Sequence, residues 1–421
     1  MPLPRFVHLL IFLCFCGELG RCAHAQPVAT TGPFVFDRAR RQQARVPFLL
    51  QRNLLVVKAL VNGRGPYNFL LDTGVSTSLL TSPGLADSLG WRHGQQFRVV
   101  GAGGLDSGLL AYQTDSVRVE LPGVVAPHMT WLVLSDDVLN LSGYVGVPIH
   151  GIMGSELFRS FVVTLRPEQG QLLLNDPATY HPPRGRLWAS IPLSLEKNKA
   201  YFTAPVQVTD SLTLPLKLVL DTGASHALSL ELESDPRLVA PTRRLAADLG
   251  RGLTGTVHGY LGRVPSVRLG RYTLRGVLTS FPDGADVHRR VEVPRNGNVG
   301  YELLKRFSLV IDYPHQRLLL RPNPTFRDPF EHDMCGIELL ATGPEFRRFL
   351  VLRVVPNSPA AAAGLEANEE LLSINFAPVS LYSLTQLDRL LHSENGRTLF
   401  LLLRRPNGDL HTASVRLKRQ I

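Results

Sequence analysis

Two copies of one short motif carry the residues best suited to chemistry in this sequence. The motif is Asp-Thr-Gly, at residues 72–74 and again at 221–223, and each copy follows three apolar residues. A carboxylate at the end of an apolar strand is costly to bury unless it is hydrogen-bonded. Glycine permits the tight turn that aims backbone N–H groups at such a carboxylate, and threonine can bond across to a partner loop. We therefore interpret Asp72 and Asp221 as functional carboxylates.

The two motifs belong to an internal repeat. Their aspartates are 149 residues apart, and a second shared motif, Gly154-Ser155-Glu156-Leu157-Phe158, recurs as Gly300-Tyr301-Glu302-Leu303-Leu304 at an offset of 146. Two Asp-Thr-Gly motifs arise by chance in fewer than about one in a hundred chains of this length. Two similar offsets in the same order indicate a duplicated unit.

Paired carboxylates at a pseudo-two-fold axis predict acid–base chemistry. Two such groups cannot both ionise easily, so they share a proton and titrate as one system. One carboxylate can then deprotonate a bound water while the other protonates a substrate carbonyl. This chemistry hydrolyses amides without a metal or other cofactor. We therefore predict that the protein uses no cofactor and binds no metal at this site. A duplicated β-barrel whose aspartates only cap turns is the open alternative.

Short strands are the elements that must position the two motifs. The 36 glycines and 31 prolines favour many short strands over long helices. Strand patterns at 54–61 and 67–71 precede the first motif, and patterns at 201–208 and 214–220 precede the second. Each motif is followed by a Gly-rich hairpin and a short helix. Paired strands then follow at 161–165 with 171–174, and at 307–311 with 317–320.

The repeat resembles the aspartic proteases over about residues 46–323. The resemblance is carried by the two Asp-Thr-Gly motifs, the Gly-rich hairpins and the apolar-apolar-Gly segment Ile152-Met153-Gly154. Each unit looks like a retropepsin-like lobe, whereas two lobes in one chain is the pepsin arrangement. The fold implied is mostly β, a two-lobed acid-protease β-barrel. Asn298 departs from the apolar pattern ahead of Gly300, and neither hairpin has a counterpart of the pepsin flap tyrosine.

The resemblance also implies the site residues. Asp72 and Asp221 would form the catalytic dyad. The loops that support the dyad would be shaped and interlocked by Thr73, Gly74, Thr222 and Gly223. The substrate-binding flaps would contain Gly101, Gly103, Gly104, Gly252 and Gly255.

A separate module follows the Pro-rich linker at 321–329. The segments Ser358-Pro359-Ala360 and Ala363-Gly364-Leu365 and the strand with Ile374-Asn375 resemble a bacterial-type PDZ domain, which implies an α+β fold. A helix with apolar spacing at 384–391 follows in the same run. PDZ domains bind an extended peptide as an added strand. The resemblance places the peptide-binding loop at Cys335-Gly336-Ile337. A PDZ-like fold that only packs on the protease is the open alternative.

The first residues predict export. Arg5, an apolar run at 6–16 and Ala23-His24-Ala25 have the order of a secretory signal with cleavage after Ala25, and an anchored N-terminus is the alternative. Cleavage leaves Cys335 as the one remaining cysteine. We expect a secreted or periplasmic protein without an integral membrane segment in the mature chain. The predicted domains are a signal peptide at 1–25, an N-terminal arm at 26–45, lobe 1 at 46–178, lobe 2 at 187–323 and the PDZ domain at 330–421.

Composition narrows the functional classes. Of the 421 residues, 44% are apolar and 19% charged, which suits two or three folded domains and excludes a mostly disordered chain. The formal charge is +10, and the basic residues are scattered along the sequence apart from one cluster. We expect this cluster to lie in a solvated N-terminal arm; it is formed by Arg38, Arg40, Arg41 and Arg45. No basic face with interleaved aromatics is present, so we expect no nucleic-acid partner.

Together these features predict an aspartic endopeptidase whose PDZ module binds peptide chains. The expected partners are protein or peptide substrates and a peptide ligand of the PDZ domain. The alternative is a catalytically inactive peptide-binding or scaffold protein on the same fold, but both motifs are intact, which favours the enzyme. A zymogen in which residues 26–45 cover the cleft is a third hypothesis.

Overall fold

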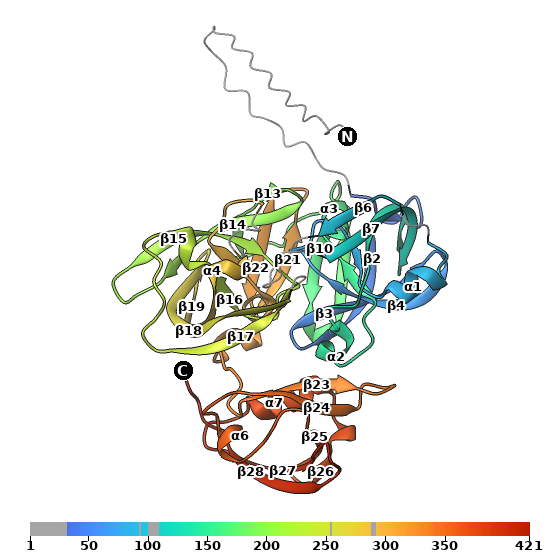
Figure 1. Ribbon diagram of the computed structural model, residues 1–421. Helices are drawn as coiled ribbons and strands as arrows, with labels where there is room; N and C mark the ends of the chain where they lie inside the picture. Colours follow the sequence, from blue (N-terminus) through green and yellow to red (C-terminus); the bar gives the residue numbers. More distant parts are fainter. Residues whose placement is uncertain (1–31, 92–93, 100–108, 253–254, 288–291) are drawn as a thin grey trace, which may run out of the picture. The chain divides into compact units, whose positions relative to one another are not determined.

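Short strands dominate the part of the chain that the structure describes. The computed structural model describes residues 32–421 apart from 92–93, 100–108, 253–254 and 288–291, and residues 31–421 form one unit (Figure 1). The prediction of a mostly β fold is confirmed. In this described part no helix is long and apolar enough to span a membrane.

Lobe 1 contains the first Asp-Thr-Gly motif. Its strands are rich in β-branched and apolar residues, such as Leu-Leu-Val-Val at the start of β3, which suits a buried pleated surface. Its elements are β1 (Val35–Phe36), β2 (Gln43–Gln51), β3 (Leu54–Val61), β4 (Arg64–Leu71), β5 (Leu79–Leu80), α1 (Pro83–Ser88), β6 (Gln96–Val99), β7 (Leu109–Leu121), β8 (Val124–Leu134), α2 (Leu141–Val145), β9 (Gly151–Met153), α3 (Glu156–Ser160), β10 (Val162–Arg166) and β11 (Gln171–Asn175).

The predicted boundary between a solvated arm and lobe 1 at residue 46 needs correction. Phe34 is buried, and β1 pairs with β8 through Val35 and Val125. Strand β2 begins at Gln43, and Asn175 of β11 lies opposite that residue. Residues 34–36 and 43–45 of the expected arm are therefore part of lobe 1, because they bury apolar surface and complete its sheet.

Lobe 2 repeats this order of elements around the second motif. Its elements are β12 (Ala189–Pro192), β13 (Ser194–Glu196), β14 (Lys199–Gln207), β15 (Thr213–Leu220), β16 (Leu228–Leu230), β17 (Arg244–Gly252), β18 (Gly255–Leu269), β19 (Tyr272–Pro282), α4 (Gly284–Val287), β20 (Gly297–Val299), α5 (Tyr301–Leu304), β21 (Phe307–Asp312) and β22 (Arg317–Pro322). In lobe 1 β4 pairs in parallel with β9, and in lobe 2 β15 pairs in parallel with β20. The matched pairings confirm the duplication.

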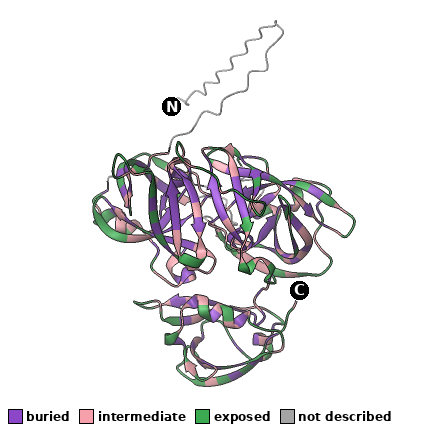
Figure 2. Cartoon of the chain, turned by 180° about the vertical axis from the view of Figure 1, so that it is seen from behind, coloured by how far each residue is buried: buried purple, intermediate pink, exposed green. Residues whose placement is uncertain are grey.

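One sheet crosses from lobe to lobe. Strands β10 and β21 pair antiparallel, with Thr164 opposite Val310, and the order through the junction is β12-β22-β21-β10-β11-β2. Buried residues lie along the strands of both lobes (Figure 2), and the rings of Phe158 and Tyr313 lie 5.7 Å apart across the junction. The two Asp-Thr-Gly loops are thereby held in register within a single chain.

The C-terminal module has a sheet and a hydrophobic core of its own. Its sheet runs in the order β23-β24-β25-β27-β28, so β23 is an edge strand. A capping box between Ser383 and Gln386 starts α7, and the predicted apolar face of this helix is buried. The elements are β23 (Ile337–Thr342), β24 (Arg348–Val354), α6 (Pro359–Ala362), β25 (Glu370–Ile374), β26 (Ala377–Pro378), α7 (Leu384–Leu391), β27 (Thr398–Arg404) and β28 (Leu410–Arg416).

Candidate active site

Equivalent strand ends present the two aspartates. Strand β4 ends at Leu71 and β15 at Leu220, and each motif follows directly. The backbone N–H of Asp72 donates to Met153 O at 2.9 Å, and that of Asp221 donates to Val299 O at 3.0 Å. The parallel partner strands β9 and β20 therefore extend the backbone hydrogen bonding by one residue beyond β4 and β15. These bonds hold the backbone of both aspartates in place.

The two threonines interlock the loops. Thr73 Oγ1 donates to Leu220 O at 2.6 Å, and Thr222 Oγ1 donates to Leu71 O at 2.9 Å. Each hydroxyl also accepts the backbone N–H of the other threonine, at 3.1 Å and 2.9 Å. Both side chains are completely buried, so all four bonds form away from water. The lobes are thus joined by a reciprocal network at the base of the dyad.

The glycines of the motif bring the two carboxyl groups together. Gly74 N donates to Asp72 Oδ1 at 2.6 Å, and Gly223 N donates to Asp221 Oδ1 at 3.1 Å. A Cβ atom on Gly223 would lie 2.1 Å from Asp72 Cγ, and one on Gly74 would lie 2.9 Å from Asp221 Oδ1. Each carboxyl group therefore lies against the glycine of the opposite loop. A side chain at either glycine would occupy the space that the carboxyl group fills.

This arrangement changes the titration of the pair. Burial, together with the neighbouring Asp221 carboxylate, raises the pKa of Asp72 from 3.8 to about 8. The Gly74 N–H and the Lys199 charge oppose the increase. Two facing carboxylates hold one proton over a wide pH range, which is the state that acid–base hydrolysis requires.

Sequence reasoning did not place two further residues in the site: Asn298, which contacts the dyad, and His226, which contacts Asn298. Asn298 Nδ2 donates to Asp221 Oδ2 at 2.7 Å, and the Nε2 atom of His226 lies 3.2 Å from Asn298 Oδ1. Burial lowers the pKa of His226. Asn298 had stood out as a polar residue where the repeat expects an apolar one, and that departure is the signal by which it could have been found.

The two lobes support their loops differently. In lobe 1 the buried Glu156 accepts the N–H and the hydroxyl of Ser78 at 2.8 Å and 3.0 Å, and burial raises its pKa. Its repeat counterpart, Glu302, instead pairs with Arg306 at 2.9 Å and accepts a hydrogen bond from Nδ2 of Asn53 at 2.8 Å. The shared Glu of the repeat thus supports the loop within lobe 1, whereas in lobe 2 it binds Arg306 and, from lobe 1, Asn53.

The second of the two predicted flaps falls on a hairpin. Gly252 and Gly255 face each other across the β17–β18 hairpin. Arg251, next to them, reaches lobe 1 and donates to Val138 O at 3.4 Å. Strands β6 and β7 also pair, with Val99 opposite Leu109, but the three first-flap residues lie outside the described residues: Gly101, Gly103 and Gly104. That these hairpins bind substrate stays a prediction.

The predicted peptide-binding loop of the PDZ module already has an internal partner. The N–H groups of Cys335 and Gly336 donate to the two carboxylate oxygens of Asp333 at 2.9 Å and 2.6 Å. Burial raises the pKa of Asp333 to about 7. Cys335 is fully buried, and Ile337 is the buried first residue of β23. The Asp333 side chain thus uses donors that a ligand carboxylate would need.

The edge of the PDZ sheet contacts lobe 1. Helix α2 packs against β23, and Cβ atoms on Gly143 and Gly146 would lie 2.9 Å from Leu340 Cδ1 and 2.8 Å from Leu384 Cβ. The contact is tied by Arg52, whose Nε lies 2.6 Å from Asp388 Oδ2 of α7 and whose Nη1 donates to Tyr144 O. The strand to which a peptide would add is therefore covered by α2.

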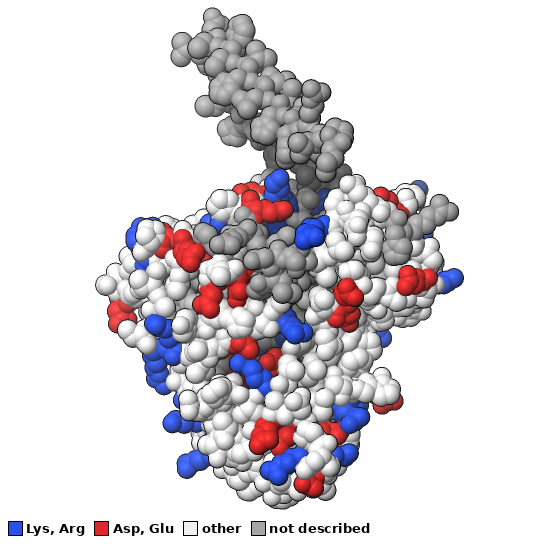
Figure 3. Space-filling view, in the orientation of Figure 1, with Lys and Arg blue, Asp and Glu red and all other residues white. Residues whose placement is uncertain are grey.

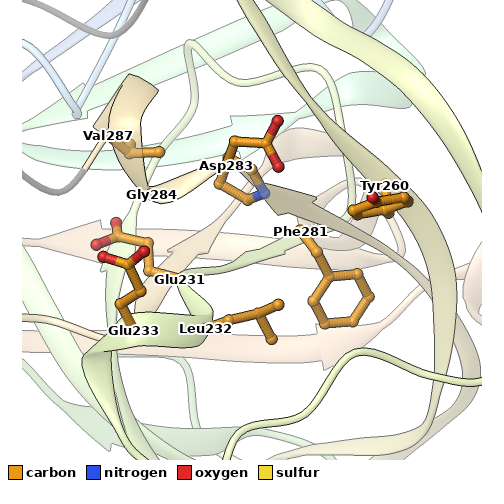
Figure 4. A pocket seen from close by; sticks show the side chains of 9 residues that line it. Glu231, Leu232, Glu233, Tyr260, Phe281, Asp283, Gly284 and Val287 are labelled. Atoms are coloured by element: carbon orange, nitrogen blue, oxygen red, sulfur yellow. The ribbon is translucent and has the colours of Figure 1, made fainter.

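A separate cavity of about 170 Å³ lies in lobe 2. Its lining residues include Glu231, Glu233 and Asp283 (Figure 4), and none of them belongs to the Asp-Thr-Gly loops. Glu231 is paired with Arg295 at 2.9 Å.

Over the face shown in Figure 3, basic and acidic side chains are interspersed. This agrees with the scattered charge expected from the sequence.

Comparisons with known proteins agree with this architecture. Residues 57–157 match the family model described as aspartyl protease, and residues 350–405 match that of the PDZ domain. The chain therefore carries an aspartyl protease domain followed by a PDZ domain. The first match ends before lobe 2, so the place of Asp221 in the site rests on the geometry above.

A solved structure entitled photosystem II D1 C-terminal processing protease is 24% identical over 20% of this chain and 22% of its own, with a TM-score of 0.19. The chain thus spans about a fifth of that structure's length. No curated protein matches the sequence.

Proposed function

We propose that this chain is an exported aspartic endopeptidase, secreted or periplasmic, in which Asp72 and Asp221 activate water against a peptide bond. The observation that carries the proposal is that two loops from different lobes interlock through Thr73 and Thr222 and press the two carboxyl groups together. The secretory pattern of residues 5–25 supports export.

The proposed reaction needs one proton on the dyad at the start. The water oxygen bonds to the scissile carbonyl carbon; one water proton passes to the ionised carboxylate, and the protonated carboxyl gives its proton to the carbonyl oxygen. A neutral gem-diol results, and the two aspartates have exchanged protonation states. The newly protonated aspartate then protonates the amide nitrogen, the other takes back a hydroxyl proton, and the C–N bond breaks. A carboxylic acid and an amine leave, and the dyad is restored.

The pH dependence of hydrolysis tests this proposal. Above a pH of about 8 Asp72 loses its proton, so kcat/KM is expected to fall about tenfold per pH unit. The free energy of unfolding should also fall between pH 3.8 and about 8, because the folded chain holds this proton more tightly than the unfolded chain does. Cleavage of denatured protein by the chain from Gln26 onward measures the first effect, and thermal unfolding across pH the second.

A statine-type peptide is the matched inhibitor, because its hydroxyl occupies the place of the attacking water. We expect it to abolish cleavage. Cleavage that resists this inhibitor, or that increases steadily above pH 9, would contradict the dyad mechanism. If the folded chain cleaves nothing at any pH, the active enzyme gives way to the non-catalytic peptide-binding alternative or to the zymogen, which N-terminal sequencing of the exported form tells apart.

The PDZ module is proposed to bind an extended peptide along β23. Edge-strand addition supplies backbone hydrogen bonds irrespective of the ligand's end. Because Asp333 already uses the N–H groups of Cys335 and Gly336, a ligand's terminal carboxylate gains little there. Free and amidated forms of an apolar peptide are therefore expected to bind alike, and in both cases α2 has to leave the strand.

The substitution Arg52→Ala tests the competition between α2 and a peptide. Losing the partly buried pair with Asp388 weakens the contact of lobe 1 with α7 by roughly tenfold in equilibrium constant. Apolar peptides should then bind the full chain about tenfold more tightly, as measured by fluorescence anisotropy. Arg118→Ala removes an exposed pair with Glu120 elsewhere in lobe 1 and is the control, expected to bind as wild type does. Equal affinity of wild type and Arg52→Ala would show that α2 does not compete.

A further inference from the structure

The dyad is asymmetric in the hydrogen bonds that it receives from outside. Asp221 accepts from Gly223 N on Oδ1 and from the Asn298 amide on Oδ2. Asp72 accepts from Gly74 N, and among the described residues no side chain outside the dyad donates to it. The reason lies in the repeat: Asn298 of β20 corresponds to Ile152 of β9, which has no donor.

His226 determines which end of the Asn298 amide faces the dyad. An asparagine side chain carries a donor at one end and an acceptor at the other. With a proton on Nε2, His226 donates to Asn298 Oδ1 at 3.2 Å, and this leaves Nδ2 directed at Asp221 Oδ2. A donor favours the ionised form of a carboxyl group over the protonated form. The chain of contacts His226–Asn298–Asp221 therefore stabilises negative charge on Asp221.

We propose that Asn298, oriented by His226, is a positioning residue that keeps the negative charge of the dyad on Asp221 and the proton on Asp72. This assignment deepens the proposed function and rests on it: Asp221 is the base that takes the proton of the attacking water, and Asp72 is the acid that protonates the carbonyl oxygen. The corresponding position of lobe 1 holds an isoleucine, so the two aspartates are not interchangeable in the first step, before they exchange protonation states at the gem-diol.

The charges around this chain of contacts agree with the assignment. The Asp221 carboxylate is the charge that acts on His226, and it opposes the effect of burial. Asp72, from lobe 1, faces Asp221 directly, and Lys199, at the start of β14, acts on Asp72. Burial lowers the pKa of His226 and so favours the neutral ring, which orients the Asn298 amide when its proton is on Nε2.

The decisive variant is Asn298→Ile, which gives lobe 2 the residue of lobe 1. Losing one hydrogen bond to a charged oxygen should move the acidic limb of kcat/KM upward by about one pH unit or more, with KM unchanged. His226→Leu should give a smaller shift in the same direction. His226→Gln keeps a donor for Asn298 and should restore the wild-type limb, and Ile152→Val, at the matching position of lobe 1, should leave it unmoved.

A second readout separates this inference from the proposed function. Carboxyl ¹³C NMR of aspartate-labelled protein follows the dyad whether or not the chain cleaves peptides, with Asp72→Asn and Asp221→Asn used to assign the signals. In wild type the first proton taken up on acidification of the ionised pair should appear at Asp72, and in Asn298→Ile a larger share of that proton should appear at Asp221. That redistribution without any hydrolysis would sink the protease and keep the assignment. Hydrolysis with unchanged titration and an unchanged acidic limb would overturn the role of Asn298.

Discussion

Replacing Asp72 or Asp221 with asparagine is expected to lower kcat/KM for a denatured protein substrate by about 10³-fold or more. An amide can neither take the proton of the attacking water nor pass one to the carbonyl oxygen. The loops should keep their shape, because an asparagine Oδ1 can still accept the N–H of Gly74 or Gly223. The loss should therefore fall on kcat, and thermal unfolding should show a folded protein that is no less stable than wild type.

Two controls accompany these variants. Asp210→Asn changes an exposed carboxylate in the β14–β15 turn of lobe 2 and should retain full activity. An equimolar mixture of the two inactive variants should stay inactive, because β10 and β21 join both loops within one chain. Recovery of activity in the mixture would mean that the dyad forms between two chains. Full cleavage by either single variant would mean that the two motifs do not form one site.

Arg306 is the buried charge on which the junction between lobe 2 and the PDZ module depends. Its side chain is 1% exposed, pairs with Glu302 at 2.9 Å and lies 3.7 Å over the ring of Phe330. Its guanidinium also donates to the carbonyl oxygens of Thr325, Asp328 and Pro329. Only a planar group with several fixed donors can hold three carbonyls and a carboxylate together.

Arg306→Ala is expected to lower the free energy of unfolding by about 3 kcal/mol, since it leaves a carboxylate and several carbonyls without their partner. Urea denaturation followed by circular dichroism measures the loss as a lower midpoint. Lys305→Ala is the matched control: it pairs with the same Glu302 from a more exposed position and should cost under about 0.5 kcal/mol. Arg306→Lys should recover only part of the stability. If Arg306→Ala unfolds at the wild-type midpoint, the linker contacts contribute nothing.

Much of the fold could be predicted because its signals are local and repeated. The strand expected at 54–61 is β3, and the pairs expected after each short helix are β10–β11 and β21–β22. Alternation of apolar residues, turn residues and the offset of the repeat are all readable within a few residues of each element. The same holds for α7, whose apolar spacing at 384–391 matches its buried face.

The features that no local pattern predicts share a different cause. Arg38, Arg40, Arg41 and Arg45 dominate the composition of residues 26–45 and indicate a solvated arm, whereas Phe34 and β1 find their partner in β8, about 90 residues away. His226 and Asn298 are 72 residues apart, and nothing in either local pattern joins them. In the sequence Arg306 looks like any surface charge. Only the fold shows that residues 325–329 of the linker cover it.

The sequence by itself determined the chemistry that this protein is built to carry: two carboxylates at the ends of apolar strands, the glycines and threonines around them, the duplication and the PDZ module. These follow from residue types and spacing, because strand ends and tight turns impose local requirements. Only the tertiary structure decided that both carboxyl groups meet within one chain, that Asn298 distinguishes Asp221 from Asp72, and that α2 covers β23. Such contacts join residues far apart along the chain, and their energies depend on burial and direction, which no local pattern specifies.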